Sequence, residues 1–107
     1  MSPRRILLAL IVAPLGLATV LAHAATIQIV MDKLVFMPAE TQAKVGDTIE
    51  WANKDILAHT ATAKSGDTWN VVIAPNKTEK LVLRKAGTVD YFCKYHPNMT
   101  GRLVITP

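Results

Sequence analysis

The chain has 107 residues, enough for one domain at most, and a formal net charge of +4. Beyond residue 24 it keeps eight lysines, two arginines and eight acidic residues, so that part carries a net charge of only +2. This is too mild an excess to indicate a nucleic-acid partner. A single cysteine, Cys93, excludes an internal disulfide. Small exported domains usually need such a cross-link or a metal, because their cores are thin.

The first 24 residues have the pattern of a secretory signal peptide. Arg4 and Arg5 precede an apolar run over 6–21, and Ala22-His23-Ala24 supplies the small residues of a cleavage site. The run is short for a bilayer span, so an uncleaved membrane anchor is the weaker alternative. We therefore expect export to the periplasm and cleavage after Ala24. The mature protein that remains after cleavage is expected to be a single domain over residues 25–107. We expect this domain to be a monomer that is not embedded in a membrane.

Short apolar runs alternate with turn residues through the rest of the chain, which is typical of an all-β domain. No segment has the period of a long amphipathic helix. Seven or eight short strands of this kind predict a β-sandwich. In chain order the expected strands are Thr26–Met31, Lys33–Met37, Thr48–Asn53, His59–Lys64, Trp69–Ile73, Thr78–Arg84, Thr88–Cys93 and Gly101–Thr106.

Tyr91 lies two residues before Cys93 and therefore on the same face of its expected strand. A tyrosine at this place is also found in the tyrosine corner of β-sandwiches. Because it shares a face with Cys93, we expect it to pack in the core rather than to carry electrons.

The candidate metal site is a cluster of soft donors near the C-terminus. Cys93 is followed by His96 and Met99 at +3 and +6, so one tight loop can bring thiolate, imidazole and thioether to one ion. His59, 34 residues upstream, is the other histidine after the signal segment and is the expected fourth ligand. Taken singly, each residue has a plain structural interpretation: a buried thiol, a loop or strand histidine, and a core methionine. Together they indicate copper, since zinc takes methionine poorly.

Two histidines and one cysteine with a weak axial methionine form the blue-copper arrangement for electron transfer. Such a site leaves no strong open position for a substrate. It also uses both histidines, so neither is left as a general base. The sequence therefore predicts an electron carrier rather than an enzyme. The alternative is a periplasmic copper-binding protein for storage or delivery, which would use the same ligands.

The segment Ala86–Met99 resembles the copper loop of cupredoxins, and within them that of the amicyanins most closely. The segment Val45–Asn53 followed by His59 is also similar to amicyanins. The resemblance covers nearly all of residues 25–107. It implies a Greek-key β-sandwich with one type 1 copper, held strongly by His59, Cys93 and His96 and axially by Met99.

The same resemblance implies a route for electrons. The edge of His96 would reach the surface as the electron port. The donor would be a dehydrogenase, such as methylamine dehydrogenase, and the acceptor a c-type cytochrome in the bacterial periplasm.

The chain departs from the family pattern around the loop. Many cupredoxins have asparagine after the first histidine ligand, where this chain has Thr60, which keeps the backbone N–H but offers a shorter side chain. In the family, the asparagine that matches Asn53 connects its loop to a small hydroxyl-bearing residue directly after the cysteine. This chain has Lys94 at that position. Tyr95 and Asn98 replace apolar residues, so the expected docking face is more polar.

Overall fold

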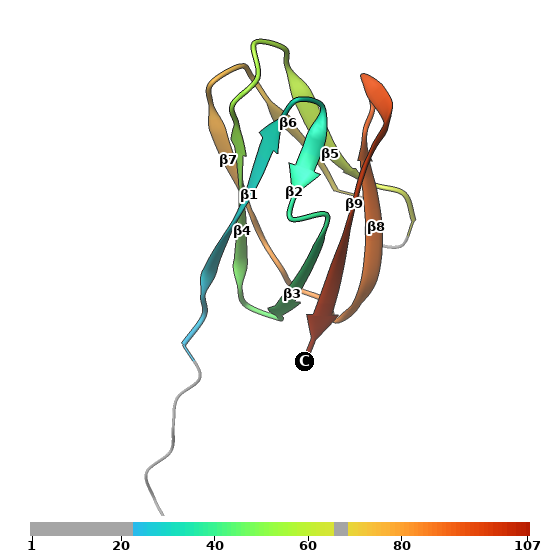
Figure 1. Ribbon diagram of the computed structural model, residues 1–107. Helices are drawn as coiled ribbons and strands as arrows, with labels where there is room; N and C mark the ends of the chain where they lie inside the picture. The colour runs from blue at the N-terminus through green and yellow to red at the C-terminus, as the bar shows by residue number, and fades with distance from the viewer. Residues whose placement is uncertain (1–22, 66–68) are drawn as a thin grey trace, which may run out of the picture.

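The structure, a computed structural model, describes residues 23–65 and 69–107. This part of the chain forms two β-sheets packed face to face (Figure 1). One sheet has the strand order β2-β1-β4-β7 and the other β3-β9-β8-β5-β6. The strands are β1 (Thr26–Asp32), β2 (Val35–Met37), β3 (Glu40–Lys44), β4 (Thr48–Asn53), β5 (His59–Ala63), β6 (Asn70–Ile73), β7 (Thr78–Val82), β8 (Gly87–Cys93) and β9 (His96–Thr106).

The all-β sandwich is as expected from the sequence, but the described residues contain nine strands rather than seven or eight. The unexpected strand is β3, which pairs in parallel with β9. Its inward residues are Thr41 and Ala43, one polar and one small, so this segment shows no apolar alternation. The last strand also begins earlier than expected, because β8 and β9 pair as a hairpin up to Cys93 and His96.

The core lies between the two sheets and follows from the alternation of side chains along each strand. In β4, Ile49 and Trp51 are fully buried, as the pattern predicts. In the parallel neighbour β1, Ile29 lies opposite Trp51. Cys93 and Met99, two of the four candidate ligands, belong to the same buried cluster.

Tyr91 packs in the core, as expected from its position. Its ring makes an edge contact with Phe36 at a centroid distance of 4.7 Å and with Trp51 at 5.7 Å. Within the described residues its hydroxyl has no hydrogen-bond partner, so the structure shows no tyrosine corner. Burial raises the pKa of Tyr91 to about 12, and the neighbouring Trp51 side chain acts in the opposite direction. Tyr91 is therefore neutral across the physiological range.

In the described part of the chain no helix is long and apolar enough to cross a membrane. Most of the predicted signal peptide, residues 1–22, lies outside the described residues.

Candidate metal centre

The candidate site lies at the end of the sandwich away from the C-terminus, where two loops meet (Figure 1). One loop joins β4 to β5 and leads into His59, the first residue of β5. The other closes the β8–β9 hairpin between Cys93 and His96. Because β5 and β8 are neighbours in one sheet, residues that are 34 positions apart in sequence meet here.

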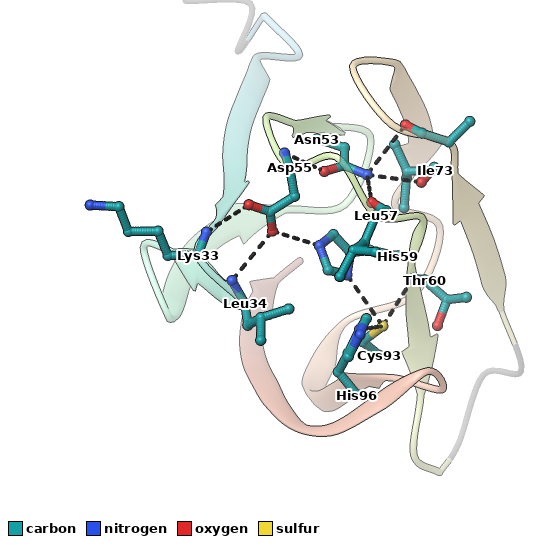
Figure 2. A network of polar contacts seen from close by, with 11 residues as sticks. Lys33, Leu34, Asn53, Asp55, Leu57, His59, Thr60, Ile73, Cys93 and His96 are labelled. Atoms are coloured by element: carbon teal, nitrogen blue, oxygen red, sulfur yellow. Dashed lines mark hydrogen bonds and ion pairs between the residues drawn. The ribbon is translucent and has the colours of Figure 1, made fainter.

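The structure brings together the ligand atoms of three of the four side chains that the sequence selected, those of His59, Cys93 and His96. Cys93 Sγ lies 3.7 Å from His59 Nδ1 and 3.6 Å from His96 Nδ1 (Figure 2). All three ligand atoms lie within 4.8 Å of one another, so they could hold one metal ion. Metal–sulfur bonds of about 2.3 Å and metal–nitrogen bonds of about 2.0 Å, at tetrahedral to trigonal angles, place sulfur and nitrogen about 3.5 to 3.7 Å apart. The observed separations fit an ion between them.

The four residues differ in burial. His59 and Cys93 are completely buried, and Met99 is 2% exposed. His96 is half-buried and lines an open hollow of about 370 Å³ on the surface. Met99, Leu34, Tyr95, Pro97 and Asn98 line the same hollow. Of the four candidate ligands, His96 is thus the most exposed to solvent.

A carboxylate fixes the orientation of His59. Nε2 of His59 lies 2.7 Å from Asp55 Oδ2, and the Asp55 side chain is 14% exposed. A carboxylate only accepts hydrogen bonds when ionised, so Nε2 carries the proton. In the neutral imidazole Nδ1 then carries a lone pair, which faces Cys93 Sγ at 3.7 Å. A carboxylate behind a histidine in this way is the usual support of a metal-binding imidazole.

Asp55 is itself held by a turn. Its oxygens accept the backbone N–H groups of Lys33 at 2.8 Å and Leu34 at 3.3 Å (Figure 2). Partial burial raises the pKa of Asp55, but the hydrogen bonds from His59, Lys33 and Leu34 outweigh it and hold the pKa below its ordinary value. Asp55 is therefore ionised at neutral pH.

The turn that holds Asp55 is strained. Lys33 and Leu34 have φ of 53° and 63°, the left-handed region that side chains other than those of glycine and asparagine rarely adopt. Both N–H groups point to one carboxylate, which helps to keep the β1–β2 hairpin in this conformation.

Asp55 is not among the site residues that the sequence predicts. The sequence does contain a signal for it, because Asp55 lies four positions before the candidate ligand His59. An acidic residue at that distance can reach the ring nitrogen that faces away from the metal.

Thr60 braces the cysteine loop in spite of its short side chain. Its backbone N–H donates to Cys93 Sγ at 3.3 Å. Its hydroxyl oxygen accepts the N–H of Lys94 at 2.8 Å. Thr60 therefore holds both the sulfur of Cys93 and the peptide that follows it.

Asn53 makes no hydrogen bond to Lys94. Its amide nitrogen donates to the carbonyls of Leu57, Ile73 and Ala74 at 2.8 to 3.2 Å, and its oxygen accepts the N–H of Asp55. It thus fixes the β4–β5 loop against the end of β6. In this chain the connection to the residue after the cysteine comes from Thr60 instead.

Comparison with known proteins agrees with this geometry. A family model described as a cupredoxin-like domain matches residues 5–105. Amicyanin-alpha of Methylorubrum extorquens is 30% identical over 78% of this chain and 75% of its own length. Amicyanin of Paracoccus versutus is 28% identical over 86% of this chain and 72% of its own length.

Solved structures of amicyanin variants are also similar. One in the Cu(I) form has a TM-score of 0.70 and 29% identity, over 79% of this chain and 85% of that one. Another in the reduced state has a TM-score of 0.68 and 28% identity, over 75% and 81%. With the family model matching most of its length, the chain belongs to the cupredoxin family, and within that family it is similar to the amicyanins.

Proposed function

We propose that this protein is a type 1 copper electron carrier, with one copper ion held by His59, Cys93, His96 and, axially, Met99. The observation that carries the proposal is the position of Cys93 Sγ, which is 3.6 to 3.7 Å from the Nδ1 atoms of two histidines. When bound, copper supplies a one-electron couple to this donor set. The soft sulfur donors match copper better than zinc.

The surrounding residues favour electron transfer over catalysis or metal delivery. Electron transfer is fastest when the ligands keep nearly one geometry in both oxidation states, and this requires a rigid support. Asp55 fixes His59, and Thr60 fixes Cys93 at two points. A delivery protein must release its metal, which buried and braced ligands oppose. Both histidines of residues 25–107 are assigned to the metal, so we propose no catalytic role.

The half-buried His96 is the proposed port for electrons. It borders the open hollow between Leu34, Tyr95 and Pro97, where a partner could approach within a short distance of the metal. We propose a dehydrogenase as donor, with methylamine dehydrogenase as the specific candidate, and a c-type cytochrome as acceptor. Both are carried over from the resemblance to amicyanins.

We further propose that the protein acts as a monomer in the bacterial periplasm. Export would use residues 1–24 as a signal peptide, and residues 25–107 would form the working domain. N-terminal sequencing of the protein recovered from the periplasm tests the cleavage site.

Copper titration tests the proposed site. Adding Cu(II) to the purified domain should produce an intense blue colour that saturates at one copper per chain, because thiolate-to-copper charge transfer is strong. Ascorbate should bleach the colour reversibly. Cys93→Ser should remove it, since a hydroxyl cannot replace the thiolate donor. A Cys93→Ser variant that stays blue would show that the site is wrongly assigned.

A further inference from the structure

A row of polar side chains runs along β5 away from the candidate metal centre. Thr60 and Thr62 are two positions apart on this strand, so both lie on the face opposite to Ala61, which is in the core. Their hydroxyl oxygens are 2.9 Å apart. On the neighbouring strand β6, Asn70 lies directly opposite Thr62 and accepts its hydroxyl at 2.6 Å. The three side chains form one continuous chain of hydrogen bonds.

The direction of each hydrogen bond follows from the number of protons. Asn70 Oδ1 can only accept, so Thr62 gives it its single hydroxyl proton. Thr62 must then accept from Thr60, whose own proton points along the strand. Thr60 Oγ1 in turn accepts the N–H of Lys94 on one of its lone pairs. Each hydroxyl donates once and accepts once, and bonds in such a series strengthen one another.

We propose that Thr62 and Asn70 are positioning residues of the metal centre, acting through Thr60 on the peptide that follows Cys93. The inference rests on the proposed function, because it assigns these residues to the support of a copper ligand. Thr60 is 1% exposed and Thr62 is 7% exposed, so water does not readily replace a lost partner. Without Thr62, the hydroxyl of Thr60 loses its acceptor and its fixed orientation.

The effect should extend to the cysteine sulfur. Thr60 holds the Lys94 amide with its hydroxyl and the Cys93 sulfur with its N–H. Hydrogen bonds to the cysteine sulfur tune the reduction potential of a blue-copper site. A looser Thr60 weakens the N–H contact and leaves more negative charge on the thiolate. That charge opposes reduction, so the potential should fall.

The first test is amide hydrogen exchange of Lys94 in the metal-free protein, measured by NMR. Thr62→Val keeps the shape of the side chain and removes the hydroxyl, so exchange at Lys94 should become about tenfold faster. Thr62→Ser restores a hydroxyl and should return the rate to within about twofold of wild type. Asn70→Leu removes the last acceptor of the hydrogen-bond chain, at an exposed position. It should also make exchange at Lys94 faster, but by less than Thr62→Val does.

Thr41→Val is the matched control. Thr41 is also a buried strand threonine, 5% exposed, but within the described residues its hydroxyl has no hydrogen-bond partner. This variant should leave exchange at Lys94 unchanged. The Leu103 amide, in the core strand β9, reports global stability in every variant. If Lys94 exchange does not change in Thr62→Val, or rises only in step with Leu103, the proposal is overturned.

The second test uses the copper-loaded protein. The reduction potential should fall in Thr62→Val, return in Thr62→Ser and stay constant in Thr41→Val. Faster Lys94 exchange with an unchanged potential would reduce the hydroxyl chain to a purely structural feature and overturn the positioning role. Failure of the wild-type protein to bind copper would contradict the proposed function instead, and the metal-free exchange result would still decide whether the hydroxyl chain exists.

Discussion

Asp55 accepts a hydrogen bond from Nε2 of the fully buried His59 at 2.7 Å. This contact places the imidazole proton on the nitrogen that faces away from Cys93, so the other nitrogen is ready to bind a metal without changing tautomer. Asp55 thus links the strained turn at Lys33 and Leu34 to the donor set.

Replacing Asp55 should therefore weaken copper binding. Asp55→Ala should lower the affinity for Cu(II) by about 10- to 100-fold, because His59 loses the partner that orients it. Asp55→Asn keeps an acceptor without the charge, so its affinity for Cu(II) should lie between those of wild type and Asp55→Ala. Competition with a chelator of known affinity measures all three. Glu79→Gln, an exposed acid on β7, is the control and should bind as wild type does.

The turn at Lys33 and Leu34 gives a second prediction, on stability. Both residues have positive φ, whereas two-residue hairpin turns of this kind favour Asn-Gly. The double change Lys33→Asn and Leu34→Gly should raise the free energy of unfolding of the metal-free protein by about 1 kcal/mol, since it relieves the strain. Denaturant unfolding measures the difference. Leu34→Ala keeps a side chain at positive φ, so a gain of the same size in that variant would point to a cause other than strain.

Part of this site could be predicted from the sequence because it depends on local spacing. Cys93, His96 and Met99 belong to one β-hairpin, that of β8 and β9, so their separation in the chain limits their separation in space. The supporting contacts depend instead on strand register. Asp55 meets a turn more than 20 residues away, and Thr62 meets Asn70 across a strand pair. A polar strand such as β3 likewise gave no apolar pattern to detect.

Gly101 provides a third prediction, because the Tyr91 ring lies against its backbone. Gly101 is paired with Tyr91 across β8 and β9, and a Cβ at this position would overlap the Tyr91 ring. Gly101→Ala should therefore lower the free energy of unfolding by about 1 to 3 kcal/mol, as overpacking does in other cores. Tyr91→Phe is the companion variant. It removes a hydroxyl that has no partner within the described residues and should leave stability unchanged or slightly raised. If Gly101→Ala leaves the free energy of unfolding unchanged, the Tyr91 ring can move aside without cost and the prediction is wrong.

Asp47 gives the pH dependence of stability. The N–H of Ala25 at 2.8 Å and that of Lys44 at 2.9 Å donate to its carboxylate, and together they lower the pKa of Asp47 below its ordinary value of 3.8. A carboxyl whose pKa is lower in the folded state stabilises the fold above the unfolded pKa and loses this effect as the pH falls through the folded pKa. The stability difference between wild type and Asp47→Asn should be constant from neutral to mildly acidic pH. Below about pH 3.8 it should shrink.

The same carboxylate connects the fold to the proposed cleavage after Ala24. Cleavage there would change the donor at Ala25 from an amide into the amino terminus, which is positively charged at neutral pH. Hydrogen bonds from charged donors to carboxylates are stronger than those from neutral ones. A domain that begins at Ala25 should therefore melt at a higher temperature than the same domain with one glycine added before Ala25. Asp47→Asn should abolish this difference, because it removes the negative partner. Thermal unfolding of the four metal-free proteins at pH 6 provides the comparison. If the added glycine has the same effect with Asn at position 47, the terminal charge does not act through Asp47.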